Sequence, residues 1–414
     1  MVHLKINNIP VEVKEGSTIL EAAKVAGINI PTLCYLKEIN EIGACRVCVC
    51  EVKGARSLVA ACVYPVNEGM EVFTNTEKVR KSRKTTLELL LSDHKKECLS
   101  CVRSTNCELQ KLSNEYGCDE NRFQGARSEY EEDNSTSYLV RDNEKCILCR
   151  RCVAVCKKVQ EVAVIAPSRR GFNTHIACAF ESDLNDAPCV ACGQCVAVCP
   201  TGALREREEI DNVREAINDP EKVVVVAAAP AVRAAIGEEF GYPIGTNTEG
   251  KMFTAMRMLG FDKVFDVNFG ADLTILEEAN ELLHRVKEGG TLPMFTSCSP
   301  GWIRFVEYYY PELIPNLSSC KSPMQMFGAT VKTYWAQKEG IDPKNIYVVG
   351  VMPCTAKKFE KTRDDENASG YPDIDAVLTT RELAKMIKNS GILYNELPDG
   401  TFDNPLGEFT GDRK

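Results

Sequence analysis

The sequence predicts a multidomain chain that combines α+β and α/β folds, and three observations lead to this expectation. Its 414 residues exceed what one hydrophobic core usually supports, so two to four domains are expected. Most of its 21 cysteines lie before Arg205 in short, regularly spaced runs. Beyond Arg205 cysteines become rare, and apolar strands alternate with helical patterns. We therefore expect several small metal-binding domains followed by one larger α/β domain.

Composition and charge exclude several classes of protein. A net charge of -9 and a pI near 5.3 provide no basic surface for nucleic acid. No apolar run approaches the roughly 18 residues of a membrane helix, and "MVHLKINNIPVEVKEG" lacks the blocks of a signal peptide. We expect a cytoplasmic protein, in which reduced cysteines more often bind metal than form disulfides.

Residues 1–78 are expected to form a β-grasp ferredoxin domain. "VHLKINNIPVEV" alternates apolar and polar residues about Ile9-Pro10, as a hairpin does, and Thr18 and Glu21 form a capping box before a helix. Cys50 is interpreted as a packing residue, because a free cysteine behaves as a small hydrophobe. A C-x10-C-x2-C-x13-C spacing, which favours a 2Fe-2S cluster over a cubane, assigns four ligands: Cys34, Cys45, Cys48 and Cys62.

Residues 79–127 are predicted to form a small domain around one imidazole and three thiols. Zinc also accepts such a ligand set. Because the set lies between two iron-sulfur modules, we favour a 4Fe-4S cluster. The three remaining histidines have no cysteine cluster around them and are interpreted as ordinary residues. The predicted ligands are His94, Cys98, Cys101 and Cys107.

Residues 137–205 carry two runs with the spacing C-x2-C-x2-C-x3-C, which is typical of 4Fe-4S cubanes. In two-cluster ferredoxins the fourth cysteine of each run ligates the other cluster. Two zinc sites or buried free thiols are the alternatives, which the shared spacing disfavours. Four clusters in succession indicate an electron wire. The assignment is Cys146, Cys149, Cys152 and Cys199 for one cubane, and Cys189, Cys192, Cys195 and Cys156 for the other.

Residues 206–414 are expected to form an α/β domain. "KVVVVAAAPAVRAAIGEEF" is typical of a buried parallel strand that runs into a helix, and "NIYVVGVMPC" and "DAVLTTRELAKMIKNSG" repeat the plan. Thr274 with Glu277, and Thr379 with Glu382, are expected as capping boxes. No dinucleotide fingerprint or phosphate loop occurs in a strand-turn-helix setting. Chemistry is expected instead in two cysteine loops after apolar strands, "PMFTSCSPGW" and "GVMPCTAKKFE", because ligands bind beyond strand carboxyl ends.

These two loops resemble the first and second active-site signatures of the iron-only (FeFe) hydrogenases, and the resemblance extends over the whole chain. "LSSCKSP" and "FGADLTILEEANEL" are similar to the multisubunit NAD-linked members in particular. The resemblance implies that Cys354 ligates the cubane of a six-iron active-site cluster, whose diiron unit performs the chemistry. It implies that Cys298 is the proton donor and that Lys357 contacts a diatomic ligand. It also implies that protons move along Glu278, Glu281 and Ser318; a solvated helix face is the alternative for the two glutamates.

Two features depart from the family pattern. Ser299 stands where many members have a second cysteine, and Cys298 or Cys320 is the hypothetical substitute. The third family signature, E-x-M-x-C-x-x-G-C, has no counterpart up to Lys414. The resemblance therefore implies the N-terminal part of a hydrogenase catalytic domain.

The implied function is reversible H2 oxidation and proton reduction, with electrons carried by one 2Fe-2S cluster and three 4Fe-4S clusters. The expected partner is ferredoxin or an NADH-oxidising flavoprotein subunit, and a chain that carries the third signature is a further candidate. Because oxidised cubanes lose iron, we expect an anaerobic setting. One alternative is a non-catalytic electron-transfer subunit. Another is the large iron-sulfur subunit of respiratory complex I, which does not possess the two cysteine loops.

Overall fold

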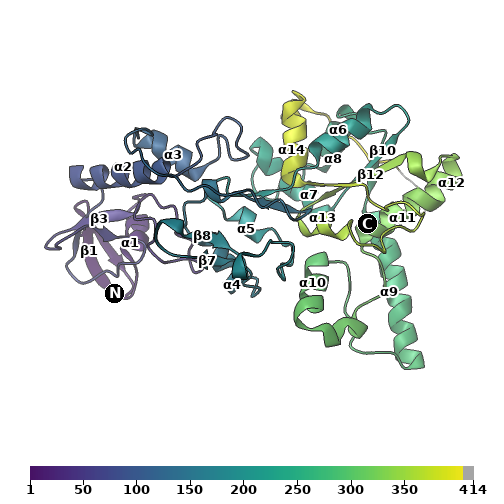
Figure 1. Cartoon of the computed structure of the whole chain (residues 1–414), viewed down its shortest axis with the longest axis horizontal. Helices are drawn as coiled ribbons and strands as arrows, with labels where there is room; N and C mark the ends of the chain where they lie inside the picture. The colour runs from purple at the N-terminus through teal and green to yellow at the C-terminus, as the bar shows by residue number, and fades with distance from the viewer. Residues whose placement is uncertain (404–414) are drawn as a thin grey trace. The chain divides into compact units, whose positions relative to one another are not determined.

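The computed structural model describes residues 1–403 and divides into two compact units (Figure 1). The first unit comprises Met1–Cys189 and Gln194–Arg205. The second comprises Val190–Gly193 and the chain from Glu206 onward. Residues 404–414, the end of the predicted catalytic domain, lie outside the described residues.

The first unit begins with a five-stranded sheet in the order β2-β1-β5-β3-β4. A helix, α1 (Ile19–Val25), packs beside it and begins with the predicted Thr18/Glu21 capping box, which is confirmed. Apolar side chains on alternate positions of the first two strands form the core with α1. The strands are β1 (Val2–Ile6), β2 (Ile9–Val13), β3 (Val49–Val52), β4 (Val59–Ala60) and β5 (Glu71–Phe73).

The predicted hairpin is confirmed, but its turn was placed wrongly. β1 and β2 pair antiparallel with Ile6 opposite Ile9, so the turn residues are Asn7 and Asn8. Both have left-handed backbone, with φ of 48° and 68°, which suits a two-residue turn and which asparagine tolerates. Pro10 lies within β2, an edge strand, where its missing N–H breaks no central ladder.

The remaining part of the first unit is built from short helices and strands that hold the cysteine loops. α2 begins after Thr76, whose hydroxyl accepts a hydrogen bond from Val79 N. A second apolar cluster joins leucines of α2 and α3 to Cys34, Cys45 and Cys149. The elements are α2 (Glu77–Ser92), α3 (Glu108–Glu115), α4 (Arg151–Lys158), α5 (Gln194–Ala197), β6 (Leu139–Arg141), β7 (Ala166–Ser168), β8 (His175–Ala177) and β9 (Leu204–Glu206).

The second unit is built around a four-stranded parallel sheet in the order β11-β10-β12-β13. Its strands are almost completely buried, as expected for a parallel sheet covered on both faces. A strand is present in each of the three stretches predicted to join the sheet, "KVVVVAAAPAVRAAIGEEF", "NIYVVGVMPC" and "DAVLTTRELAKMIKNSG". The strands are β10 (Val223–Ala228), β11 (Lys263–Asp266), β12 (Ile346–Met352) and β13 (Ala376–Thr379).

The helices of the second unit confirm one predicted capping box and show that the other was wrong. Thr379 and Glu382 cap α14 as expected. Thr274 lies inside α9, which already begins at Asn268, and its hydroxyl donates to Gly270 O one turn earlier. The helices are α6 (Ile210–Asn218), α7 (Pro230–Ala235), α8 (Glu249–Met258), α9 (Asn268–Glu288), α10 (Pro300–Tyr309), α11 (Pro323–Thr330), α12 (Ala336–Glu339), α13 (Ala356–Glu360) and α14 (Thr380–Asn389).

The two expected catalytic loops differ in how they are supported. Cys354 lies two residues after the end of β12, in the loop where it was predicted. The stretch before Cys298 is not a strand: it forms a single parallel bridge between Phe295 and Leu317. Pro293 in this stretch has no N–H to donate, which limits further pairing. Within residues 1–403, no helix has the length and apolar character that crossing a membrane requires.

Candidate functional site

The four cysteines predicted to bind a 2Fe-2S cluster are all buried and lie in two close pairs. Cys45 N donates to Cys34 Sγ at 3.5 Å, and the sulfurs of Cys48 and Cys62 are 3.3 Å apart. A hydrogen bond from the Cys34 thiol lowers the pKa of Cys45 to about 6, and one shared with Cys62 lowers the pKa of Cys48 to about 7. The same bonds raise the pKa of Cys34 and of Cys62, so one thiol of each pair is favoured as the thiolate, which is the form that binds iron.

Asn40 joins this cysteine loop to the first cubane run, which sequence reasoning did not predict. Its side chain is 2% exposed, and its Nδ2 donates to Cys34 O at 2.7 Å and to Cys149 O at 3.0 Å. The two N–H bonds of one amide therefore hold two predicted ligand loops together. The partners are 6 and 109 residues from Asn40 in the sequence, so no local signal identifies the contact.

One small apolar cavity lies at the predicted site of the first cubane. Ile147, Ile176 and Leu204 supply apolar lining, and Thr201 donates to Lys145 O at 2.8 Å, which ties the two cysteine runs together. Burial raises the pKa of Cys146 to about 12 and that of Cys149 to about 11. The structure brings the four assigned thiols around this cavity: Cys146, Cys149, Cys152 and Cys199.

Three of the four cysteines assigned to the other cubane belong to the first unit. Burial raises the pKa of Cys156, and the nearby Cys189 thiol raises it further. Cys195 is close enough to Cys152 to raise the pKa of that thiol, after the larger effect of burial. Cys192 lies in the Val190–Gly193 segment of the second unit.

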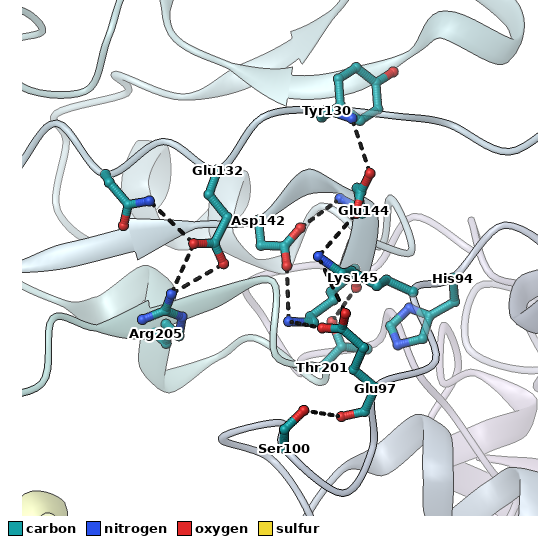
Figure 2. Close-up of polar contacts among 12 residues, drawn as sticks. His94, Glu97, Ser100, Tyr130, Glu132, Asp142, Glu144, Lys145, Thr201 and Arg205 are labelled. Atoms are coloured by element: carbon teal, nitrogen blue, oxygen red, sulfur yellow. Dashed lines mark hydrogen bonds and ion pairs between the residues drawn. The ribbon is translucent and has the colours of Figure 1, made fainter.

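His94 is a buried, neutral imidazole beside a cationic side chain (Figure 2). Burial, followed by the charge of Lys145, lowers the pKa of His94 to about 4. Its Nδ1 has no hydrogen-bond partner in the part of the chain that the structure describes. A neutral imidazole with a free nitrogen is the form that ligates metal. Lys145 Nζ itself pairs with Asp142 at 3.0 Å and with Glu97 at 3.7 Å.

The three thiols assigned to the His94 site differ in burial. Cys98 is exposed, whereas Cys101 and Cys107 are half-buried. Burial raises the pKa of Cys107, and the neighbouring Cys101 and Cys98 raise it further. A Cβ added to Gly202 would lie 2.5 Å from Cys101 Sγ, so only glycine lets the backbone of residue 202 approach this thiol.

Among residues 1–403, no group of three or more His, Cys, Asp or Glu side chains is arranged to hold a single metal ion.

In the second unit, two loops converge around Cys298 and Lys357. Lys357 Nζ donates to Cys298 O at 3.0 Å and forms an ion pair with Glu360 at 2.9 Å. Ser297 Oγ donates to Cys320 O at 2.5 Å, which brings the Cys320 loop to the same place. The Cys298 side chain is exposed. Ser299, the residue before α10, forms no side-chain cap with that helix.

The predicted proton-carrying residues Glu281 and Ser318 are in direct contact. Ser318 Oγ donates to Glu281 Oε2 at 2.8 Å, and Arg285 Nη2 donates to Oε1 at 2.5 Å. Burial favours the protonated form of Glu281, but these hydrogen bonds outweigh it and lower its pKa. Glu278 Oε1 is buried without a partner within residues 1–403. Neither carboxylate therefore lies on a fully solvated helix face. Arg285 was missed, although its i, i+4 spacing from Glu281 is a recognisable signal.

The Cys354 loop contacts the segment that contains Cys192. Thr355 Oγ1 donates to Ala191 O at 2.7 Å, and both residues belong to the second unit. Gly193 has φ of 73°, and a Cβ added there would lie 2.6 Å from Thr355 Oγ1. Thr355, next to Cys354, can therefore lie against the Cys192 segment because residue 193 has no side chain.

Four family models match successive parts of the chain. A 2Fe-2S iron-sulfur cluster binding domain matches residues 1–77, and the NADH-ubiquinone oxidoreductase-G iron-sulfur binding region matches 83–122. A 4Fe-4S dicluster domain matches 145–203. The C-terminal domain of the iron only hydrogenase large subunit matches 222–414.

The NADP-reducing hydrogenase subunit HndD of Solidesulfovibrio fructosivorans is 50% identical over 423 residues, which cover 99% of this chain and 72% of that protein. This chain belongs to the iron-only hydrogenase family. The predicted membership and the mixed multidomain fold are thereby confirmed. Iron hydrogenase 1 of Clostridium pasteurianum, another relative, is 46% identical over 98% of this chain and 71% of its own length.

More distant matches cover only part of the chain. The 75 kDa subunit of NADH-ubiquinone oxidoreductase from Reclinomonas americana is 36% identical over 45% of this chain and 27% of that protein. A solved apo FeFe-hydrogenase from Chlamydomonas reinhardtii is 48% identical, with a TM-score of 0.46, and the match covers 48% of this chain and 52% of that one. The match of the hydrogenase domain to residues 222–414 favours the hydrogenase family over the alternative of a complex I subunit.

Proposed function

We propose that this chain is the active-site and electron-carrying subunit of a hydrogenase that converts H2 reversibly into two protons and two electrons. The observation that carries the proposal is the convergence, in the second unit, of Cys298, Lys357 and the Cys320 loop. The two family signatures lie on these loops and on the loop after β12 that carries Cys354. The 50% identity with a hydrogenase subunit over 99% of the chain supports the same reaction.

The cofactors of this proposal are one 2Fe-2S cluster, three 4Fe-4S clusters and the six-iron active-site cluster. When bound, the six-iron cluster supplies the redox centre at which H2 is split or formed. Cys354 would hold its cubane part. The paired thiols of the first domain, the cavity of the first cubane and the buried neutral His94 support the accessory assignments.

The chain's own residues would move protons and hold the active-site loops. Ser318 Oγ already donates to Glu281 Oε2, so a proton can pass between these atoms without movement of the backbone. Arg285 holds Glu281 in the ionised form that accepts a proton. Lys357, held by Cys298 O and Glu360, would present its ammonium group to a bound diatomic ligand. Cys298 would deliver the proton from its exposed thiol.

Electrons would enter through the accessory clusters from a flavoprotein subunit that oxidises NADH or NADPH, with ferredoxin as the second candidate. HndD is named as a subunit of an NADP-reducing hydrogenase, and the iron-sulfur region of NADH-ubiquinone oxidoreductase matches residues 83–122. Both relatives work within multisubunit assemblies, which favours a dedicated partner over a free ferredoxin. Anaerobic pull-down of the chain, followed by flavin analysis of the captured protein, distinguishes the two.

A non-catalytic electron wire is the second candidate function, and Ser299 favours it, because a serine replaces one expected cluster ligand. An infrared spectrum of the chain, expressed anaerobically with the hydrogenase maturation proteins, decides between the two. Bands in the CO and cyanide stretching region would identify a catalytic subunit. If these bands are absent while electron paramagnetic resonance (EPR) shows intact accessory clusters, the chain is a non-catalytic electron-transfer subunit. Ser299→Cys is the matched variant. If the wild type shows no CO or cyanide bands and residue 299 is the missing ligand, this variant should show them.

A further inference from the structure

Arg83 is a buried cation without a carboxylate partner in the part of the chain that the structure describes. The residue lies on α2 and is 4% exposed. Its Nη2 donates to Val49 O at 2.8 Å and its Nη1 to Tyr116 Oη at 3.0 Å, and both acceptors are neutral. Its Nε has no partner within residues 1–403. Since arginine stays protonated in proteins, this is a full buried positive charge.

The nearest groove does contain carboxylates, but they are engaged with other cations. The groove has a volume of about 530 Å³ and is lined by Arg83, Glu108 and Glu115 among other residues. Glu108 forms a two-pronged ion pair with Arg151, at 2.6 and 2.9 Å. Glu115 lies 4.0 Å from Lys111. An isolated buried charge is costly, so a counter-charge for Arg83 is expected elsewhere.

Arg83 faces the backbone of the proposed 2Fe-2S site. Val49, which accepts its hydrogen bond, directly follows Cys48 in the sequence. Its Nη2 also lies 3.8 Å from Cys50 Sγ. The Cys48 sulfur, in turn, is 3.3 Å from that of Cys62. The guanidinium group thus contacts the two residues that follow Cys48, which is one of the four predicted ligands of the 2Fe-2S cluster.

We propose that Arg83 provides the counter-charge of the 2Fe-2S cluster and raises its reduction potential. The inference rests on the proposed function, because it requires Cys34, Cys45, Cys48 and Cys62 to hold that cluster. A cluster with four thiolates is negatively charged, and reduction adds one more negative charge. A fixed cation in a buried environment stabilises the reduced state more than the oxidised state. Arg83 is a positioning residue here, since it acts on the cluster through its charge.

The test is an EPR redox titration of the anaerobically purified full chain. Arg83→Gln removes the charge but keeps a donor for Val49 O, whereas Arg83→Lys keeps the charge. Tyr116→Phe is the matched control, because it removes a hydrogen bond to the guanidinium without changing any charge. We expect the midpoint potential of the 2Fe-2S signal to move to more negative values in Arg83→Gln only. The midpoints of the cubane signals should stay where they are in the wild type.

Each other outcome also decides the matter. An Arg83→Gln midpoint equal to that of the wild type, with the signal intact, would overturn the proposal and leave the cluster assignment standing. If Arg83→Gln loses the 2Fe-2S signal while Arg83→Lys retains it, the charge is needed to hold the cluster, which supports the proposal. Loss in both variants would assign Arg83 a purely structural role and refute it. A wild-type chain without a 2Fe-2S signal would overturn the cluster assignment itself.

Discussion

Replacement of Lys358 by methionine should destabilise the second unit by about 3–5 kcal/mol. Lys358 is completely buried, and its Nζ lies 3.0 Å from one oxygen of Glu382 and 3.1 Å from the other. It also donates to Val377 O at 2.5 Å. Glu382 caps α14 and is itself 3% exposed, so the variant leaves its carboxylate buried without a cation. Breaking a buried ion pair by removing one partner is the costly case.

The loss of stability should depend on pH. Burial raises the pKa of Glu382 even though Lys358 acts in the opposite direction, so removal of the ammonium group raises this pKa further. A carboxyl group with a raised folded-state pKa binds protons more readily in the folded chain than in the unfolded chain. The contribution of this group to stability is then fully present below its unfolded-state pKa of about 4.3, and it is lost as the pH rises through the folded-state pKa. The difference between variant and wild type should therefore be larger at pH 8 than at pH 5.5.

Tryptophan fluorescence during urea unfolding measures this effect, because both tryptophans, Trp302 and Trp335, belong to the second unit. Lys385→Met is the matched control: Lys385 forms an exposed pair with Glu208, for which a loss below about 1 kcal/mol is expected. Equal midpoints for Lys358→Met and Lys385→Met would refute the argument from buried charge. So would a loss that is the same at both pH values.

Two further predictions concern electron and proton transfer. Gly193→Ala should slow reduction of the active-site cluster, because the new Cβ would lie 2.6 Å from Thr355 Oγ1 and push apart the loops of Cys192 and Cys354. Stopped-flow absorbance measures the rate, and Gly245→Ala, with φ of 77° and open space around its Cβ, controls for backbone strain of about 1 kcal/mol. Arg285→Met should raise the pKa of Glu281, because burial then acts with one opposing hydrogen bond fewer. The low-pH limb of hydrogen evolution should move to higher pH, and an unchanged profile would remove Glu281 from the proton path.

Features that are local in the sequence could be predicted, because their geometry is fixed over a few residues. The cysteine spacings and the capping boxes of Thr18 and Thr379 are of this kind. The same local pattern failed at Thr274, because α9 had already begun six residues earlier and no free N–H remained to cap. The hairpin turn was misplaced because Pro10 is a stronger turn signal than Asn7 and Asn8, although an edge strand tolerates proline.

Contacts between distant segments could not be predicted, and they carry most of the new chemistry. Arg83 meets Val49 across 34 residues and Asn40 meets Cys149 across 109 residues. In a sequence, an arginine inside "KVRKSRKTTLELLL" is typical of an exposed helix position. Only the packing of α2 against β3 makes it a buried charge beside the cysteine loop.

The buried polar side chains around the cysteine loops fall into two kinds, and the difference has a consequence for electron flow. Asn40 and Thr355 are neutral and bind backbone carbonyls beside predicted ligands, so they fix distances between sites without adding charge. Arg83 brings positive charge to the loop of Cys48, and Lys145 brings positive charge to His94. Lys145 is balanced by Asp142, whereas Arg83 has no such partner within residues 1–403. The larger uncompensated charge therefore lies beside the proposed 2Fe-2S site, so Arg83 should raise the potential there more than Lys145 raises that of the proposed His94 site.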